Sequence, residues 1–181
     1  MIANLPNILT LARILLLPFF AAAIIYREYK IALIIFIAAS VTDLLDGWIA
    51  RLTKQITYFG SILDPVADKF FLITSFILMS NKGLMPKWLT IIVISKDLIV
   101  VTGCIILYFV TSKLEIEPSF WGKAASFCQF ILVGLVLVFI NINVTAEIPM
   151  VVFAFVAVLT SVAGIQYIHQ GLKAANIDHS N

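Results

Sequence analysis

The amino-acid sequence predicts an all-α integral membrane protein, and two observations support this fold class. Hydrophobic residues make up 62% of the 181 residues, whereas charged residues make up only 12%. Soluble domains are apolar over roughly half of their residues, so this chain is too apolar for that class. The apolar residues also gather in six runs, each close to the roughly 20 residues that a helix needs to cross a bilayer. We therefore expect a bundle of six transmembrane helices in one domain, residues 1–181.

Charged residues and turn-forming residues separate the six runs. The first and second runs are divided by R-E-Y-K, the second and third by the segment 52–61, and the third and fourth by Gly83 and Pro86. Pro118 precedes the fifth run, and the segment 141–147 precedes the sixth. The expected helices are Ile8–Tyr26, Ile31–Arg51, Leu63–Ser80, Trp88–Val110, Phe120–Ile140 and Ile148–Ile168. An even number of spans places both termini on one side.

Basic residues are shared unevenly between the two sides of this bundle. One side would carry Arg51, Lys54, Lys113, Lys123 and Lys173, and the other Arg27, Lys30, Lys82 and Lys87. Cytoplasmic loops are enriched in Lys and Arg, so we expect both termini on the cytoplasmic side. The net charge of +2 indicates neither nucleic acid nor an acidic protein as a partner.

Four of the ten acidic residues lie in the stretch from Asp43 to Asp68. Asp43 and Asp46 are three residues apart, and Asp64 and Asp68 are four apart, so each pair projects from one face of a helix. If the two helices form a hairpin, these faces can meet. Clustered carboxylates near hydrocarbon need neutralising cations or protons, and oxygen ligands favour a hard divalent cation. We therefore predict a polar, metal-containing cavity near the cytoplasmic boundary, rather than a polar network or helix caps alone.

The spacing D-x2-D-G-x2-A-R-x8-G-x3-D-x3-D resembles the signature of the CDP-alcohol phosphatidyltransferases. Its eight fixed positions are met by Asp43, Asp46, Gly47, Ala50, Arg51, Gly60, Asp64 and Asp68. The resemblance implies that the four aspartates hold two divalent cations, Mg²⁺ or Mn²⁺, which bind the diphosphate of a CDP-lipid. It also implies that Asp68 is the catalytic base that takes the proton of the acceptor's hydroxyl.

The remaining signature positions are predicted to contact the CDP-lipid. Gly47 and Gly60 lack a Cβ, so the backbone there can approach a phosphate closely, and Ala50 belongs to the same pattern. The planar guanidinium of Arg51 suits phosphate oxygens. Its alternative role is to extend from a helix end to the membrane interface.

The opening N-L-P-N-I-L-T-L-A-R resembles the start of phosphatidylglycerophosphate synthases and of the CDP-lipid-dependent cardiolipin synthases. Asn7, Thr10 and Arg13 recur at three-residue intervals and share a helix face. We assign Asn7 and Thr10 to the CDP-lipid and Arg13 to the acceptor. The alternative is a capped first helical turn at the interface, with no ligand contact.

Two later stretches, I-S-K-D-L-I-V and P-S-F-W-G-K, extend the resemblance and contain Lys96 and Lys123. We predict that both lysines bind the acceptor's phosphate, although Lys96 and Asp97 could instead pair with polar groups of the bundle. Phosphatidylglycerophosphate synthases typically have Arg-Glu at Lys96-Asp97, a further Arg at Cys104 and a basic residue near Ala125. The resemblance therefore leaves two acceptors open, dianionic glycerol 3-phosphate and the phosphodiester phosphatidylglycerol.

Together these features predict a phosphatidyltransferase that moves the phosphatidyl group of CDP-diacylglycerol to such an acceptor and releases CMP. The alternative is a small cation or proton transporter that uses the aspartates as its ion path. Arg51 argues against a transporter. Its positive charge would stabilise a bound diphosphate, whereas a site that binds transported cations has no evident need for an arginine beside it. We expect a bacterial inner-membrane protein whose active site faces the cytoplasm, and the resemblance adds a possible homodimer.

Overall fold

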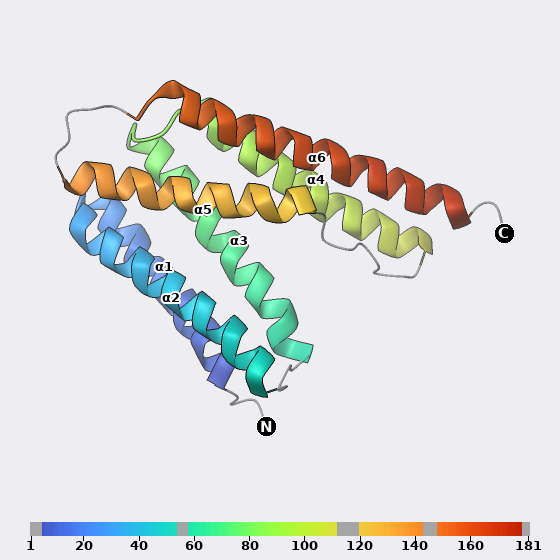
Figure 1. The fold of residues 1–181 in the computed structure, drawn as a ribbon, viewed down its shortest axis with the longest axis horizontal. Coiled ribbons are helices and arrows are strands. Elements are labelled where there is room, and N and C mark those ends of the chain that lie inside the picture. Colours follow the sequence, from blue (N-terminus) through green and yellow to red (C-terminus); the bar gives the residue numbers. More distant parts are fainter. Residues whose placement is uncertain (1–4, 54–57, 112–119, 143–147, 179–181) are drawn as a thin grey trace. The chain divides into compact units, whose positions relative to one another are not determined.

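The computed structural model describes residues 5–53, 58–111, 120–142 and 148–178, and within these ranges all regular secondary structure is helical. Side chains are described for residues 11–42, 67–103, 120–142 and 148–170. The helices are α1 (Leu5–Ile25), α2 (Tyr29–Thr53), α3 (Tyr58–Asn81), α4 (Lys87–Thr111), α5 (Phe120–Asn141) and α6 (Met150–Asp178). The prediction of six helices is thus confirmed over this part of the chain (Figure 1).

Two predicted boundaries differ from the observed ones by five residues or more, and for one physical reason. Helix α3 begins at Tyr58, so residues 58–61 are helical rather than part of a loop, and α6 continues beyond Ile168 to Asp178. The length of an apolar run predicts the part of a helix that fits the hydrocarbon layer. Polar residues beyond that part can continue the helix, because the backbone hydrogen bonds of a helix do not depend on apolar side chains.

The helices divide into two compact units. The first unit is Met1–Leu84 with Val133–Glu147, and the second is Met85–Leu132 with Ile148–Asn181. Helices α1, α2 and α3 therefore belong to the first unit, and α4 and α6 to the second. Helix α5 contributes its first part to the second unit and its last part to the first.

Aromatic packing forms the centre of the first unit, where α1 packs against both α2 and α3. Phe20, Phe36 and Phe71 come from these three helices, and each is at most 5% exposed. The ring centroids of Phe20 and Phe71 are 4.9 Å apart, and those of Phe36 and Phe71 are 6.1 Å apart. A Cβ added at Gly134 of α5 would lie 3.0 Å from the ring of Phe36, so the absence of a side chain lets α5 approach this cluster.

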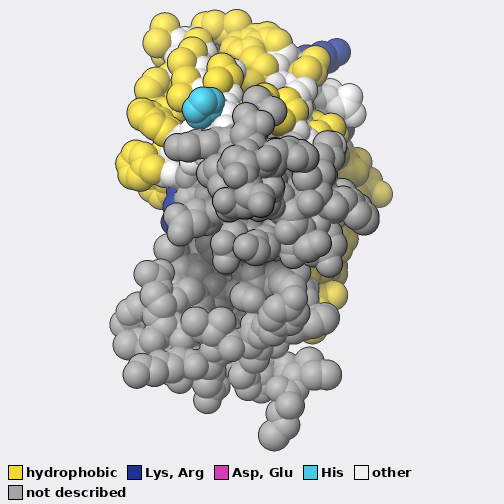
Figure 2. All heavy atoms as spheres, turned by 90° about the vertical axis from the view of Figure 1, so that its right-hand side faces the viewer, with side chains coloured by type: hydrophobic (Ala, Val, Ile, Leu, Met, Phe, Trp, Pro, Cys, Tyr) yellow, Lys and Arg dark blue, Asp and Glu magenta, His cyan; other side chains and the backbone are white. Residues whose placement is uncertain are grey.

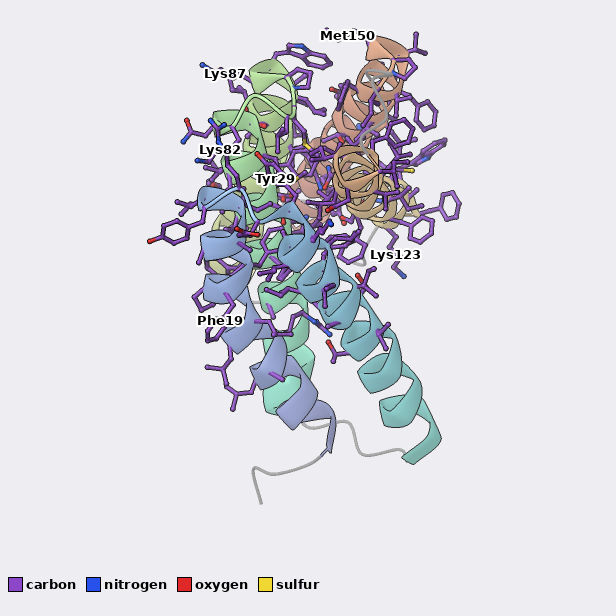
Figure 3. All side chains as sticks on the ribbon, turned by 90° about the vertical axis from the view of Figure 1, so that its left-hand side faces the viewer. Phe19, Tyr29, Lys82, Lys87, Lys123 and Met150 are labelled. Carbon is purple, nitrogen blue, oxygen red and sulfur yellow. The ribbon has the colours of Figure 1, made fainter. Side chains whose placement is uncertain are left out.

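Polar contacts join the helices of the first unit at one end. The Nζ of Lys82 donates a hydrogen bond to the carbonyl of Ile25 at 2.8 Å, which ties the end of α3 to the end of α1. The side chain of Asn141 donates to the carbonyl of Tyr29 at 2.9 Å, which ties α5 to the start of α2. Figure 3 shows Lys82 and Tyr29 at this end. The opposite end of the unit is where α1 begins, α2 ends and α3 begins (Figure 1).

In the second unit α4 packs against α6, and small residues let the helices approach closely. A Cβ at Gly164 of α6 would lie 3.3 Å from Cγ of Lys96 on α4. A Cβ at Gly122 of α5 would lie 2.6 Å from the hydroxyl of Tyr167 on α6. Close helix packing at small residues is typical of membrane proteins, where apolar burial does not drive association.

The outer surface of the described residues is strongly apolar. On α6, for example, Val151, Phe155, Val158 and Ile165 are 58–76% exposed. Figure 2 shows hydrophobic side chains over most of the described part of one face. Within the described residues, Phe120–Asn141 and Met150–Gln170 are long and apolar enough to cross a bilayer, and Leu11–Ile25 and Tyr29–Thr42 form shorter apolar helices.

Candidate active site

The four predicted metal ligands lie on two consecutive helices of the first unit. Asp43 and Asp46 fall in the second half of α2, and Asp64 and Asp68 fall in the first half of α3. Helix α2 ends and α3 begins at the same end of this unit (Figure 1). The two helices therefore run in opposite directions from this end, as the hairpin expected from the sequence would, and the meeting of the two carboxylate pairs stays a prediction. The side chains of Asp43, Asp46 and Asp64 lie outside those that the structure describes.

The other signature positions share this end of the first unit. Gly47, Ala50 and Arg51 follow the first aspartates on α2, and Gly60 precedes the second pair on α3. Asn7 and Thr10 lie in the first turns of α1, which begins at the same end (Figure 1). All six residues lie outside the ranges in which side chains are described.

Asp68, the predicted base, is in contact with a buried arginine. Nη1 of Arg13 on α1 forms an ion pair and hydrogen bond with Oδ1 of Asp68 on α3. The side chain of Arg13 is 2% exposed, whereas that of Asp68 is 43% exposed. A buried guanidinium needs an anionic partner, so this contact orients the carboxylate of Asp68 while leaving it accessible. The predicted acceptor residue Arg13 thus lies beside the predicted base.

The two predicted acceptor lysines belong to the second unit and differ in burial. Lys96 on α4 is 5% exposed, and its Nζ lies 2.8 Å from Oδ1 of Asp97, which is equally buried. The two residues thus pair with each other along α4, and the binding of the acceptor's phosphate by Lys96 stays a prediction. Lys123 near the start of α5 is exposed, and Figure 3 shows its side chain pointing away from the helices.

A buried polar contact between α5 and α6 was not predicted. Gln129 is 0% exposed, and its Nε2 donates a hydrogen bond to Oγ1 of Thr160, also 0% exposed, at 3.0 Å. A usable signal was present in the sequence, since Gln129 is a carboxamide in the middle of an otherwise apolar run. Polar side chains within membrane spans are costly and are therefore candidates for function.

The residues present suit a divalent cation by their chemistry. Carboxylate oxygens are the ligands that Mg²⁺ and Mn²⁺ favour, and the accessible carboxylate of Asp68 can supply one. Among the side chains that the structure describes, no three Asp, Glu, His or Cys residues lie close enough together to hold a metal ion. Three of the four predicted aspartates are not among these side chains. Helices α2 and α3 carry all four of the predicted ligands.

Comparisons with known proteins agree with this arrangement. A sequence model of the CDP-alcohol phosphatidyltransferase family matches residues 3–163, across both units. A probable phosphatidylglycerophosphate synthase of Mycobacterium tuberculosis is 33% identical over 95% of this chain and 83% of its own length. The CDP-diacylglycerol–glycerol-3-phosphate 3-phosphatidyltransferase of Haemophilus influenzae is 34% identical over 97% of both chains. Human cardiolipin synthase (CMP-forming) is 30% identical over 96% of this chain and 64% of its own length.

These matches cover nearly the whole chain. The chain therefore belongs to the CDP-alcohol phosphatidyltransferase family, as the eight signature positions indicated. It is a transferase of phospholipid synthesis, and relatives in both the phosphatidylglycerophosphate and the cardiolipin groups are similar to it. The comparisons thus favour the enzyme over the transporter alternative and leave both predicted acceptors in place.

Proposed function

We propose that this protein transfers the phosphatidyl group of CDP-diacylglycerol to a glycerol-containing acceptor and releases CMP. The observation that carries the proposal is the placement of the signature. All eight fixed positions fall on α2 and α3, towards the end of the first unit where the two helices are joined, and Asp68 is held there by Arg13.

Asp68 is the base of the proposed reaction. Its carboxylate accepts the proton of the acceptor's hydroxyl, and the hydroxyl oxygen attacks the phosphorus that carries diacylglycerol. A new oxygen–phosphorus bond forms while the bond from that phosphorus to the phosphate oxygen of CMP breaks. The contact with Arg13 fixes the direction of this carboxylate, as a base that must face the acceptor's hydroxyl requires.

We assign Asp43, Asp46, Asp64 and Asp68 to two divalent cations, Mg²⁺ or Mn²⁺. When bound, such cations neutralise a diphosphate and stabilise the departing phosphate. Gly47, Ala50, Arg51 and Gly60, with Asn7 and Thr10, would then contact the CDP-lipid. Their common location at one end of α1, α2 and α3 supports this assignment.

We further propose that the six helices span the bacterial inner membrane as a bundle, with the metal site near the cytoplasmic boundary. The apolar outer surface and the two long apolar helices support a membrane location. The excess of basic residues on the side of the termini supports the orientation. A homodimer remains part of the proposal from the resemblance alone.

Burial and charge in the second unit favour phosphatidylglycerol over glycerol 3-phosphate as the acceptor. The ammonium of Lys96 is already paired with Asp97 at 2.8 Å, so this pair supplies little net positive charge. Ala125 is 0% exposed and uncharged where the glycerol-phosphate enzymes are expected to place a basic residue. A dianion needs more compensating charge than a phosphodiester lipid, which gains affinity from its acyl chains as well.

Product identification tests the proposal. The purified full-length protein would be incubated with CDP-diacylglycerol, Mg²⁺ and either acceptor, and the lipid products would be identified by mass spectrometry. We expect cardiolipin from phosphatidylglycerol in larger yield than phosphatidylglycerophosphate from glycerol 3-phosphate. A larger yield of phosphatidylglycerophosphate would reverse the choice of acceptor, and the absence of both products would refute the proposed reaction.

A further inference from the structure

A proline weakens the middle of α1. Pro18 lies inside this helix, which runs from Leu5 to Ile25. Because proline has no backbone N–H, Pro18 cannot donate a hydrogen bond to the carbonyl of Ile14, and its ring crowds that carbonyl. Proline is also the least favourable residue in a helix interior. The backbone of α1 is therefore least constrained by its own hydrogen bonds around Ile14 and Pro18.

The ring of Pro18 does not contribute to the core of the first unit. Pro18 is exposed, and its neighbours Leu15 and Phe19 are 60% and 65% exposed. Packing therefore does not explain a residue that disfavours the helix at this position. A local loss of stability without a gain in packing is typical of positions where function needs flexibility. The effect of Pro18 falls on the backbone of α1, where a weak point can act as a hinge.

Pro18 separates two parts of α1 that are held differently. Three side chains after it are at most 7% exposed, and they belong to Phe20, Ala23 and Ile24. The first of these packs in the aromatic cluster of the first unit. In residues 11–17, before Pro18, Arg13 is the one buried side chain, and it pairs with Asp68 of α3. The later part is thus fixed in an apolar core, whereas the buried contact of the earlier part is an ion pair.

An ion pair in this position can open and close. The carboxylate of Asp68 is 43% exposed, so water reaches it while Arg13 is bound. If Arg13 withdraws from α3, water can hydrate both charges, which keeps the net cost of separating them small. Separating the aromatic cluster would instead leave a void among closely packed rings. Movement of α1 is therefore easiest in the part before the proline.

We propose that residues 5–17 of α1 form a lid, that Pro18 is its hinge, and that the pair of Arg13 and Asp68 holds it closed. The inference rests on the proposed function, because the lid would open to exchange the CDP-lipid and the lipid product. Asn7 and Thr10, which are predicted to contact the CDP-lipid, lie in the lid. Closure would therefore bring these residues and the arginine that orients the base to the site in one movement.

Distances between spin labels, measured by pulsed electron paramagnetic resonance, test the motion without any turnover. One pair of labels, at Leu11 of the lid and Ile77 of α3, reports on the lid, and these positions are 54% and 46% exposed. The control pair, at the exposed Ile25 and Phe70, joins the same two helices but uses the part of α1 after Pro18. Full-length protein in lipid nanodiscs would be used, with both native cysteines replaced by alanine.

The wild type should show two distances between Leu11 and Ile77, a shorter closed one and a longer open one. Pro18→Ala should leave only the closed distance, because alanine donates the missing hydrogen bond to the carbonyl of Ile14. Arg13→Gln should shift the population towards the open distance, since it removes the charge that holds the lid. The control pair should show one distance in all three proteins. The same distribution in the wild type and Pro18→Ala, or no shift in Arg13→Gln, would overturn the proposal.

Thermal stability and turnover should respond to the hinge in opposite directions. Pro18→Ala is expected to raise Tm in detergent, since alanine favours a helix. It should also lower kcat for CMP release by roughly fivefold or more, since a stiffer α1 opens less often. Pro18→Gly keeps a weak point in the helix and should retain most of the wild-type kcat. Wild-type kcat in Pro18→Ala, or an equal loss in Pro18→Gly, would contradict a hinge.

The two levels of the proposal fail differently. If phosphatidyl transfer is observed but the distance between Leu11 and Ile77 does not respond to Pro18→Ala, the proposed function stands and the hinge alone is refuted. If the lid moves as described but neither glycerol 3-phosphate nor phosphatidylglycerol gives a product, the proposed function is wrong. The role of the lid in lipid exchange then falls with it.

Discussion

At the residue scale, the pairing of Arg13 with Asp68 matters most, because it connects α1 to the residue proposed as base. The two residues are 55 positions apart in the sequence, and no local pattern predicts that they meet. Their contact depends on the packing of α1 against α3. The aspartate spacings, in contrast, follow from helix geometry and could be predicted from the sequence alone.

Arg13 has two proposed roles that kinetics can separate. If it positions Asp68, Arg13→Gln should lower kcat at saturating acceptor by roughly tenfold or more, since the base loses its orienting partner. Arg13→Lys should recover part of this loss, because it restores the charge without the planar fork. Lys30→Gln, at an exposed position of the same unit, is the control. A rise in the acceptor's KM with unchanged kcat would instead support the predicted role of Arg13 in acceptor binding.

Asp68→Asn tests the base directly. The amide keeps the shape and one ligand oxygen but cannot accept the proton, so we expect kcat to fall by roughly 10² to 10⁴. Binding of CDP-diacylglycerol, measured separately on the same variant, should change much less. Near-normal turnover would show that another group takes the proton, and an equally severe loss of CDP-lipid binding would point to a role mainly in holding metal.

At the element scale, the close approach of α5 to the aromatic cluster depends on Gly134. A Cβ there would lie 3.0 Å from the ring of Phe36, and this ring is 5% exposed and enclosed by Phe20 and Phe71. No local pattern singles out Gly134, because Phe36, the residue it faces, lies far away in the chain. The helices themselves could be predicted from the lengths of the apolar runs, except where α3 and α6 continue beyond those runs.

Gly134→Ala should therefore lower the free energy of unfolding by about 1–3 kcal/mol, the usual effect of overpacking a tightly packed interior. Gly103→Ala on α4 is the matched control, because nothing lies within 4 Å of its added Cβ. At that position the change is expected to be neutral or slightly stabilising, since Ala favours a helix over Gly. Thermal unfolding in detergent measures both, and an equal response of the two variants would contradict the packing argument.

At the scale of the whole molecule, the reaction class could be predicted from the sequence, but the acceptor could not. The signature is local, with eight residues at fixed spacing on two consecutive helices, so it needed no knowledge of tertiary contacts. The choice of acceptor is proposed to depend on the second unit, where Lys96 is paired with Asp97 and Ala125 is buried. The burial of these residues arises only when the helices of the second unit pack together.

The dependence of CMP release on divalent cations tests the central claim most directly. Purified full-length protein would be supplied with CDP-diacylglycerol and phosphatidylglycerol, and CMP would be measured before and after addition of EDTA. We expect chelation to abolish CMP release and Mg²⁺ or Mn²⁺ to restore it, because clustered carboxylates and a diphosphate repel each other without bound cations. Full CMP release in metal-free buffer would contradict the assignment of the four aspartates to a metal site.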